Sequence, residues 1–183
     1  MDQREIKKKV DDLLRECDVY EAPIPVEKIA QHLGIEIVGV PIPSQLSGAL
    51  IRENGNVGIT VNSTHHLHRQ RFTIAHELGH FSLDHDPKVI VGEDSHVDWT
   101  FTILRRDGLS SSALDKKEIE ANQFAAELLM PEELIKSEFA GFARNIGDQE
   151  ITPEQRKKLA KRFKVSETAL TYRLLNLGLL DPS

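Results

Sequence analysis

The chain has 183 residues, enough for one medium-sized domain or for one domain with a small appendage. Its formal net charge of -6 argues against a protein that coats nucleic acid over its whole surface. The single cysteine, Cys17, excludes an intrachain disulfide and a thiolate metal cluster built from one chain, which fits a reducing cytosol. The N-terminus lacks the apolar core of a secretory signal, and no apolar run is long enough to span a membrane. We therefore expect a cytoplasmic protein without membrane contact.

Two kinds of pattern alternate in the first half of the chain. Apolar stripes at helical spacing predict helices over residues 3–17, 26–33 and about 67–84. Runs of β-branched and apolar residues predict strands over residues 35–40, 46–52 and 57–61. Asn54-Gly55 separates the last two strands and predicts a tight hairpin turn, because Asn-Gly tolerates positive φ angles. We therefore expect a small antiparallel sheet directly before the third helix.

The second half predicts helices on either side of a long loop. The loop covers residues 87–114, and loops of that length in compact domains are usually functional. Helical patterns occur over residues 115–129, from Pro131 onward, and over residues 153–163 and 166–177. We expect an α+β fold with one domain over residues 1–140 and, beyond a linker, a C-terminal helical unit over residues 150–183.

The prediction of function rests on the segment His76-Glu77-Leu78-Gly79-His80. Residues four apart stand one turn above each other on a helix, so His76 and His80 can direct ring nitrogens at one ion. Neutral imidazole suits zinc, which lowers the pKa of water in its coordination sphere. Glu77 can take the proton of that water as it attacks a carbonyl, and can return the proton to the leaving amine. The motif predicts metal-assisted hydrolysis of a peptide bond rather than two surface histidines flanking Glu-Leu-Gly by chance.

Gly79 lies inside the predicted helix, where glycine is unfavourable. A glycine inside a helix costs about 1 kcal/mol relative to alanine. We therefore expect another backbone to approach the helix closely at Gly79, such as a sheet edge that borders the cleft.

A catalytic zinc needs a third protein ligand and an open position. One known arrangement takes this ligand six residues after the second histidine, through a glycine that breaks the helix. Here Leu83 and Asp86 hold the matching positions, so the helix should continue past Leu83 and Asp86 should point away. The later helix is the better source. Glu118 and Glu120 flank its apolar stripe on opposite sides, so only one can face the metal, and periodicity does not choose between them.

Three stretches of the chain resemble the ImmA/IrrE-type zinc metallopeptidases: residues 59–62, 69–80 and 120–131, in the order that the family has them. The resemblance implies a zincin-like fold with a small sheet beside the active-site helix. It also implies that Glu120, directly before Ala-Asn-x-Phe-Ala, is the third zinc ligand. The segment from His80 to Glu120 is longer than is usual in the family, and the extra loop could cover the cleft or bind the partner.

The resemblance also implies a narrow regulatory substrate. Members of the family typically cut or antagonise a helix-turn-helix repressor, and they often belong to mobile elements, stress responses or toxin–antitoxin-like gene pairs. The expected activity is therefore that of a zinc metalloendopeptidase whose protein substrate is a repressor or antitoxin-type partner encoded nearby.

The C-terminal unit is typical of a helix-turn-helix and is locally basic. Its basic residues are Arg156, Lys157, Lys158, Lys161, Arg162 and Lys164. These side chains could contact DNA phosphates. The second helix, however, carries only Arg173, which is poor for reading base edges. A packing role is favoured, in which the apolar residues Leu159, Phe163, Val165, Leu170 and Leu174 face the body of the protein.

The alternative function is a non-proteolytic regulator that binds a repressor, a toxin or operator DNA and uses its metal for structure. A structural zinc needs a fourth protein ligand that closes the site. The candidates close to the motif in sequence are His65, His66, His68, His85 and His96.

Overall fold

The computed structural model describes residues 1–53, 55–85, 113–143 and 151–181. Within these ranges the chain forms seven helices and a three-stranded sheet, which confirms the α+β class. In chain order the elements are α1 (Gln3–Glu16), α2 (Val26–His32), β1 (Ile35–Val40), β2 (Gly48–Glu53), β3 (Asn56–Asn62), α3 (Leu67–Ser82), α4 (Ala113–Leu129), α5 (Glu132–Ala143), α6 (Pro153–Phe163) and α7 (Glu167–Asn176). Most of the predicted loop over residues 87–114 lies outside the described residues.

The helices begin where the sequence carries start signals. Thr152 accepts a hydrogen bond from the backbone of Gln155 and its own N–H donates to the Gln155 side chain, so the capping box opens α6. Ser166 caps α7 through the N–H of Ala169. The predicted apolar stripe of α1 is buried in full, with Val10 at 0% exposure, because α1 packs on α4.

The sheet differs from the expected one in the pairing of its first strand. β2 and β3 form the predicted antiparallel hairpin, with Gly55 at φ +81°, but β1 pairs with β3 in parallel. The order is therefore β1-β3-β2, and the expectation of an antiparallel sheet is wrong for β1. The reason lies in the connection after β1, which crosses to the far edge of β3 instead of turning straight back. The buried amide of Asn62 holds this crossing by donating to the carbonyls of Ile42, Pro43 and Leu46.

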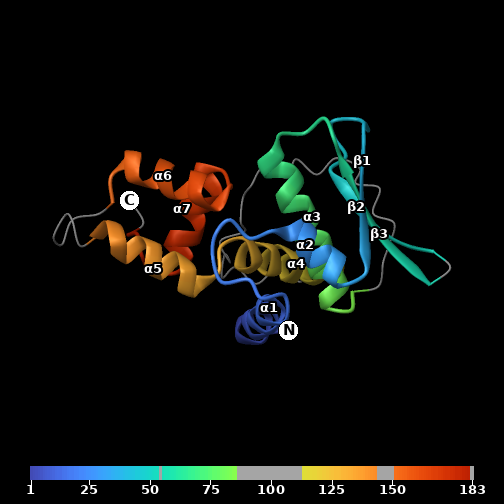
Figure 1. Cartoon of the computed structure of the whole chain (residues 1–183), viewed down its shortest axis with the longest axis horizontal. Coiled ribbons are helices and arrows are strands. Elements are labelled where there is room, and N and C mark those ends of the chain that lie inside the picture. Colours follow the sequence, from blue (N-terminus) through green and yellow to red (C-terminus); the bar gives the residue numbers. More distant parts are fainter. Residues whose placement is uncertain (54, 86–112, 144–150, 182–183) are drawn as a thin grey trace.

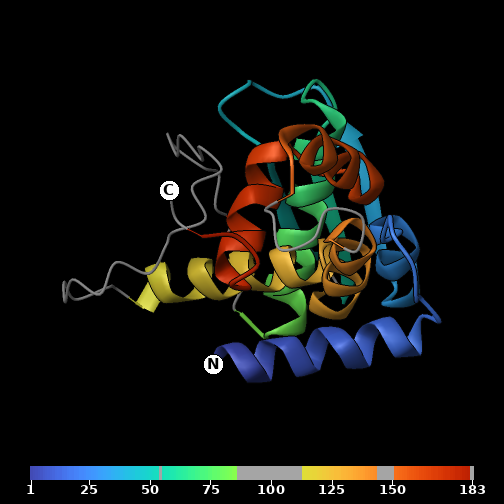
Figure 2. The same ribbon diagram turned by 90° about the vertical axis from the view of Figure 1, so that its left-hand side faces the viewer.

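Helix α3 lies between the sheet and α4, and α1 covers α4 on its other side (Figures 1 and 2). Two glycines allow these close approaches. A Cβ on Gly48 would stand 2.3 Å from the carbonyl oxygen of Thr60 and 2.7 Å from Cγ2 of Thr73, so β2 can lie against α3 only with glycine there. A Cβ on Gly79 would stand 3.1 Å from the carbonyl oxygen of Ala121. The close backbone expected at Gly79 is present, but it belongs to α4 and not to a sheet edge.

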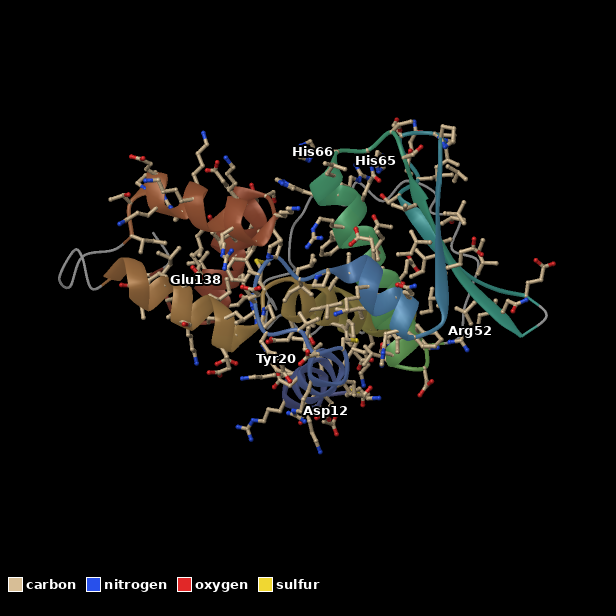
Figure 3. The ribbon with its side chains drawn as sticks, in the orientation of Figure 1. Asp12, Tyr20, Arg52, His65, His66 and Glu138 are labelled. Atoms are coloured by element: carbon tan, nitrogen blue, oxygen red, sulfur yellow. The ribbon has the colours of Figure 1, made fainter. Side chains whose placement is uncertain are left out.

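The C-terminal helices gather at the far end of α4 from the sheet (Figure 1). The apolar residues that were expected to pack are all buried: Leu159, Phe163, Val165, Leu170 and Leu174. Arg173 is buried with them, at 4% exposure, and donates to Glu127 of α4 at 2.5 Å and to the carbonyl of Met130 at 3.0 Å. Arg162 of α6 pairs with Glu138 of α5, which is labelled in Figure 3. The packing expected of these apolar residues is therefore confirmed.

No helix in the described ranges combines the length and apolar character that crossing a membrane requires.

Candidate metal centre

The two histidines of α3 meet a carboxylate of α4. Nε2 of His76 and Nε2 of His80 lie 3.0 Å apart, as expected for residues one helical turn apart on one face. Glu118 completes the group, with one oxygen 3.2 Å from Nε2 of His76 and the other 3.3 Å from Nε2 of His80. Among the described residues, these three side chains form a group that could hold a metal ion.

Glu120, which the family resemblance indicated as the ligand, takes a different place. One of its oxygens lies 3.1 Å from Nε2 of His85, and the other pairs with the amino group of Met1. Residues two apart on a helix face opposite ways, so α4 can turn only one of the two glutamates toward the histidine pair. The structure places Glu118 there.

Each histidine of the pair is held through its other ring nitrogen. Nδ1 of His76 lies 2.9 Å from Oδ1 of Asn122, which stands one turn after Glu118 on the same face of α4. Because a carbonyl oxygen only accepts, the proton of His76 is on Nδ1, and the lone pair of Nε2 faces Glu118 and His80. Nδ1 of His80 lies 3.0 Å from Nδ1 of His85. No sequence pattern indicated Asn122 or His85 in these roles, because both depend on which face of α4 meets α3.

The end of α3 explains how His85 reaches His80. The helix was expected to continue past Leu83, but it ends at Ser82, and Asp84 takes the left-handed conformation with φ 53°. The N–H of His85 donates to the carbonyl of His80 and the N–H of Asp84 to that of Phe81, which is a Schellman ending. Aspartate tolerates the left-handed region better than most residues, so it replaces the missing glycine. Asp86 lies outside the described residues.

The donor set fits a divalent cation such as zinc. Ligand atoms bound at about 2.0–2.1 Å in a tetrahedral zinc site lie roughly 3.3 Å apart, close to the 3.0–3.3 Å separations found here. Oε1 of Glu118 is buried without a hydrogen-bond partner among the described residues, as a ligand oxygen would be before it binds. Burial opposes the charge of Glu118, yet the imidazoles of His76 and His80 beside it hold its pKa far below the ordinary value. The group is therefore built to hold positive charge.

Glu77 stands next to this group without joining it. Burial raises the pKa of its carboxyl, against the opposing effects of His76 and His80 and of a hydrogen bond from the backbone of Leu50. Leu50 belongs to β2, the edge strand of the sheet that packs against α3. A carboxyl group with a raised pKa beside a cation site suits a group that accepts and then releases a proton.

The other candidate histidines do not close the site. His65 and His66 lie at the N-terminal end of α3 (Figure 3), where Nε2 of His65 contacts the carbonyl of Ser44 at 2.9 Å and His66 caps the helix. His68 follows within the first turn of α3. His85 contacts His80 on the side away from Glu118, and His96 lies outside the described residues. Within the described ranges, no fourth side chain joins His76, His80 and Glu118.

Two known proteins resemble this chain, one in sequence and one in fold. The chain is 28% identical over 113 residues to "Uncharacterized immunity region protein 2" of Bacillus phage phi105, a match that covers 62% of each chain. Its fold resembles a solved structure of a "Mycobacterium tuberculosis transcriptional regulator", with a TM-score of 0.61 at 18% sequence identity. That likeness covers 93% of this chain and 46% of the other. The chain therefore spans under half of the solved protein, and its match to the phage protein spans under two thirds of that protein.

The model of one family, Peptidase_M78, described as the IrrE N-terminal-like domain, matches residues 30–175. The matched range contains β1–β3, α3 and α4, and therefore every side chain of the histidine and glutamate group. With both the site and most of its length inside the match, the chain belongs to the family of the IrrE N-terminal-like domain.

Proposed function

We propose that this chain is a zinc-dependent, site-specific metallopeptidase with a zincin-like active site, and that it cleaves a helix-turn-helix repressor or an antitoxin-type partner. The observation that carries the proposal is the convergence of two imidazole lone pairs and one carboxylate beside Glu77, a carboxyl group that is not needed as a ligand. A site of three protein ligands is typical of catalytic zinc, whereas a structural zinc takes four.

In this proposal His76, His80 and Glu118 hold the ion, and Glu118 replaces Glu120 as the third ligand. When bound, zinc supplies a Lewis acid that polarises a peptide carbonyl and acidifies water. The two histidines are mostly buried, at 16% and 12% side-chain exposure, while Glu118 keeps 34%. Among the described residues, the site is therefore most exposed on the Glu118 side, from which water and substrate would approach.

Glu77 acts as the general base and then as the general acid. Its carboxylate takes a proton from the water molecule that attacks the scissile carbonyl, and the resulting carboxylic acid protonates the leaving amine. Burial raises the pKa of Glu77, which brings it closer to the pH at which both steps must work. The Leu50 backbone limits this rise and holds the carboxyl group in place.

Within the described residues no strand pairs with the outer edge of β2, and this edge offers a place for an extended peptide. Ser47 accepts from the N–H of Asn62, so alternate residues from Ser47 onward face β3, and Gly48, Leu50 and Arg52 direct their backbone groups outward. Unpaired groups at a sheet edge can bind a peptide as an added strand. Because the Leu50 backbone also contacts Glu77, a peptide bound along this edge passes the general base.

The nature of the substrate rests on what the chain resembles. One relative is described as an immunity region protein of a phage, and one structural neighbour is described as a transcriptional regulator. Both descriptions suit a protein that acts on a repressor. They also suit the second candidate, a non-proteolytic regulator that binds a repressor, a toxin or operator DNA. Burial of Arg173 against Glu127 weighs against base reading by α7.

The decisive experiment co-expresses the chain with candidate helix-turn-helix proteins from the neighbouring genes and looks for a discrete cleavage product. A Glu77→Gln variant should keep its zinc and lose about 10²–10⁴-fold in cleavage rate, because it lacks the group that moves the proton. Glu36→Gln, a change of the same kind at an exposed position of β1, is the matched control and should cut like the parent.

Each other outcome has a distinct meaning. If Glu77→Gln cuts as fast as the parent, the hydrolytic mechanism is wrong. If neither protein cuts the partner but both form a stable complex with it, the regulator is the correct function.

A further inference from the structure

Three side chains form a chain of hydrogen bonds behind the metal centre. Nδ1 of His80 lies 3.0 Å from Nδ1 of His85, and Nε2 of His85 lies 3.1 Å from Oε2 of Glu120. His85 is 5% exposed and Glu120 is 8% exposed, so water competes little for these contacts. The function proposed above uses neither residue.

The direction of each hydrogen bond follows from the last acceptor. An ionised carboxylate only accepts, so Nε2 of His85 carries the proton that Glu120 binds. Nδ1 of a neutral His85 is then an acceptor, and the proton between the two rings must belong to Nδ1 of His80. This leaves the lone pair of His80 on Nε2, which points at His76 and Glu118.

From this geometry we propose that His85 and Glu120 are positioning residues that fix the tautomer and the ring orientation of His80 for metal binding. The proposal rests on the proposed metal site but not on peptide cleavage. Metal-ligating histidines are commonly oriented by such outer partners, whose loss typically costs about 10–100-fold in metal affinity. A single residue orients His76 in the same way, because Nδ1 of His76 contacts the amide oxygen of Asn122.

The backbone holds His85 in register with His80. The Schellman ending of α3 ties the N–H of His85 to the carbonyl of His80 at 3.0 Å, so the two residues are fixed at both backbone and ring. Glu120 is fixed in turn by the amino group of Met1, and Lys116 lies 3.9 Å from the same oxygen. Both contacts are made to Oε1 of Glu120, which leaves Oε2 facing Nε2 of His85.

The first test measures zinc affinity by competition with a chelator. His85→Ala should bind zinc about 10–100-fold more weakly than the parent. Glu120→Ala should also lose affinity, while Glu120→Gln, whose amide oxygen can still accept from Nε2 of His85, should recover part of the loss. His32→Ala, which removes an exposed histidine at the end of α2, is the matched control and should bind like the parent.

The second test needs no metal. Long-range proton–nitrogen spectra of the isotope-labelled, metal-free protein show which ring nitrogen of each histidine carries the proton. The parent should carry it on Nδ1 of His80 and Nε2 of His85, and His85→Ala should move the His80 proton toward Nε2. A loss of fold alone would instead shift every histidine and lower the melting temperature.

The proposal is overturned if His85→Ala leaves both the zinc affinity and the His80 tautomer unchanged, or if the parent carries the His80 proton on Nε2. If the parent tautomers are as expected but no variant or parent holds zinc, the metal site of the proposed function fails and the hydrogen-bond chain stands.

Discussion

Helix α4 carries glutamates in both of its halves, and the two halves use them differently. In the N-terminal half, Glu118 and Glu120 contact histidines, whose neutral imidazole is a common metal ligand. In the C-terminal half, Glu127 forms an ion pair with the guanidinium of Arg173, and both side chains are buried. The same residue type therefore belongs to a partly exposed site at one end and to a buried ion pair at the other.

The contacts that each glutamate makes decide whether it can bind a further ligand. Glu118 keeps 34% exposure and one buried oxygen without a hydrogen bond, so it has capacity left for a ligand. Glu127 has none left. One of its oxygens accepts from Arg173 and the other from the N–H of Glu132 at the start of α5. Function is therefore expected at the first end of α4 and stability at the second.

The largest expected effect is on stability and comes from breaking the buried pair. Glu127→Ala or Arg173→Ala leaves an uncompensated charge in the interior, so each should lower the free energy of unfolding by about 3–5 kcal/mol in urea titrations. The double variant Glu127→Leu/Arg173→Leu should lose much less, because it removes both charges. Zinc affinity measured below the unfolding transition should not change. Single variants as stable as the parent would contradict the role of this ion pair in holding α7 against α4.

The next largest effect separates the two glutamates of the site end. Glu118→Ala should weaken zinc binding by more than the roughly 100-fold that marks the upper range for outer partners, since it removes the proposed third ligand. Glu120→Ala should cost less, because it acts through His85. Chelator competition on both variants decides the order. If Glu120→Ala proves the more damaging change, the family-based assignment of Glu120 as the ligand is correct and Glu118 is not the third ligand.

Periodicity predicted which histidines share a face, but it did not predict whether Glu118 or Glu120 faces them. The spacing of His76 and His80 is a property of one helix, so periodicity predicted their shared face correctly. Which glutamate faces them depends on the rotation of α4 about its own axis. That rotation is set where Ala121 packs on Gly79, a contact between residues 42 positions apart in the chain. The glycine predicted that some backbone would come close, but it could not say which one.

Two further differences each depend on a single residue. Asp84 ends α3 in a conformation more typical of glycine, so no glycine marks the point where the helix stops at Ser82 and the chain folds His85 back. The parallel pairing of β1 depends on the Asn62 side chain, which binds three carbonyls of the connection after β1. Strand patterns specify which residues are buried, whereas strand order depended here on one buried amide.

The smallest expected effect concerns a third glutamate contact, where α5 meets α1. Nζ of Lys7 lies 2.6 Å from Oε2 of Glu132, and Lys136 pairs with the other oxygen. Hydrogen bonds from Lys136 and Lys7 hold the pKa of Glu132 at about 2, below its ordinary value of 4.5. A carboxyl group with a lowered pKa in the folded state stabilises the fold at pH values above 4.5. That contribution is lost as the pH falls from 4.5 through about 2.

Glu132→Gln should therefore lower the free energy of unfolding by about 1 kcal/mol at neutral pH, since the pair is close to the surface and partly screened. The difference from the parent should shrink as the pH falls through this window, because the parent then loses the same charge. Urea titrations at pH 7, 4 and 3 measure it, with Glu133→Gln, a more exposed neighbour 3.5 Å from Lys7, as the matched control. A difference that stays constant with pH would mean that Glu132 stabilises the junction by packing and not by its charge. Added salt should distinguish the two ion pairs. It should weaken the partly exposed contact of Glu132 and leave the buried contact of Glu127 nearly unchanged.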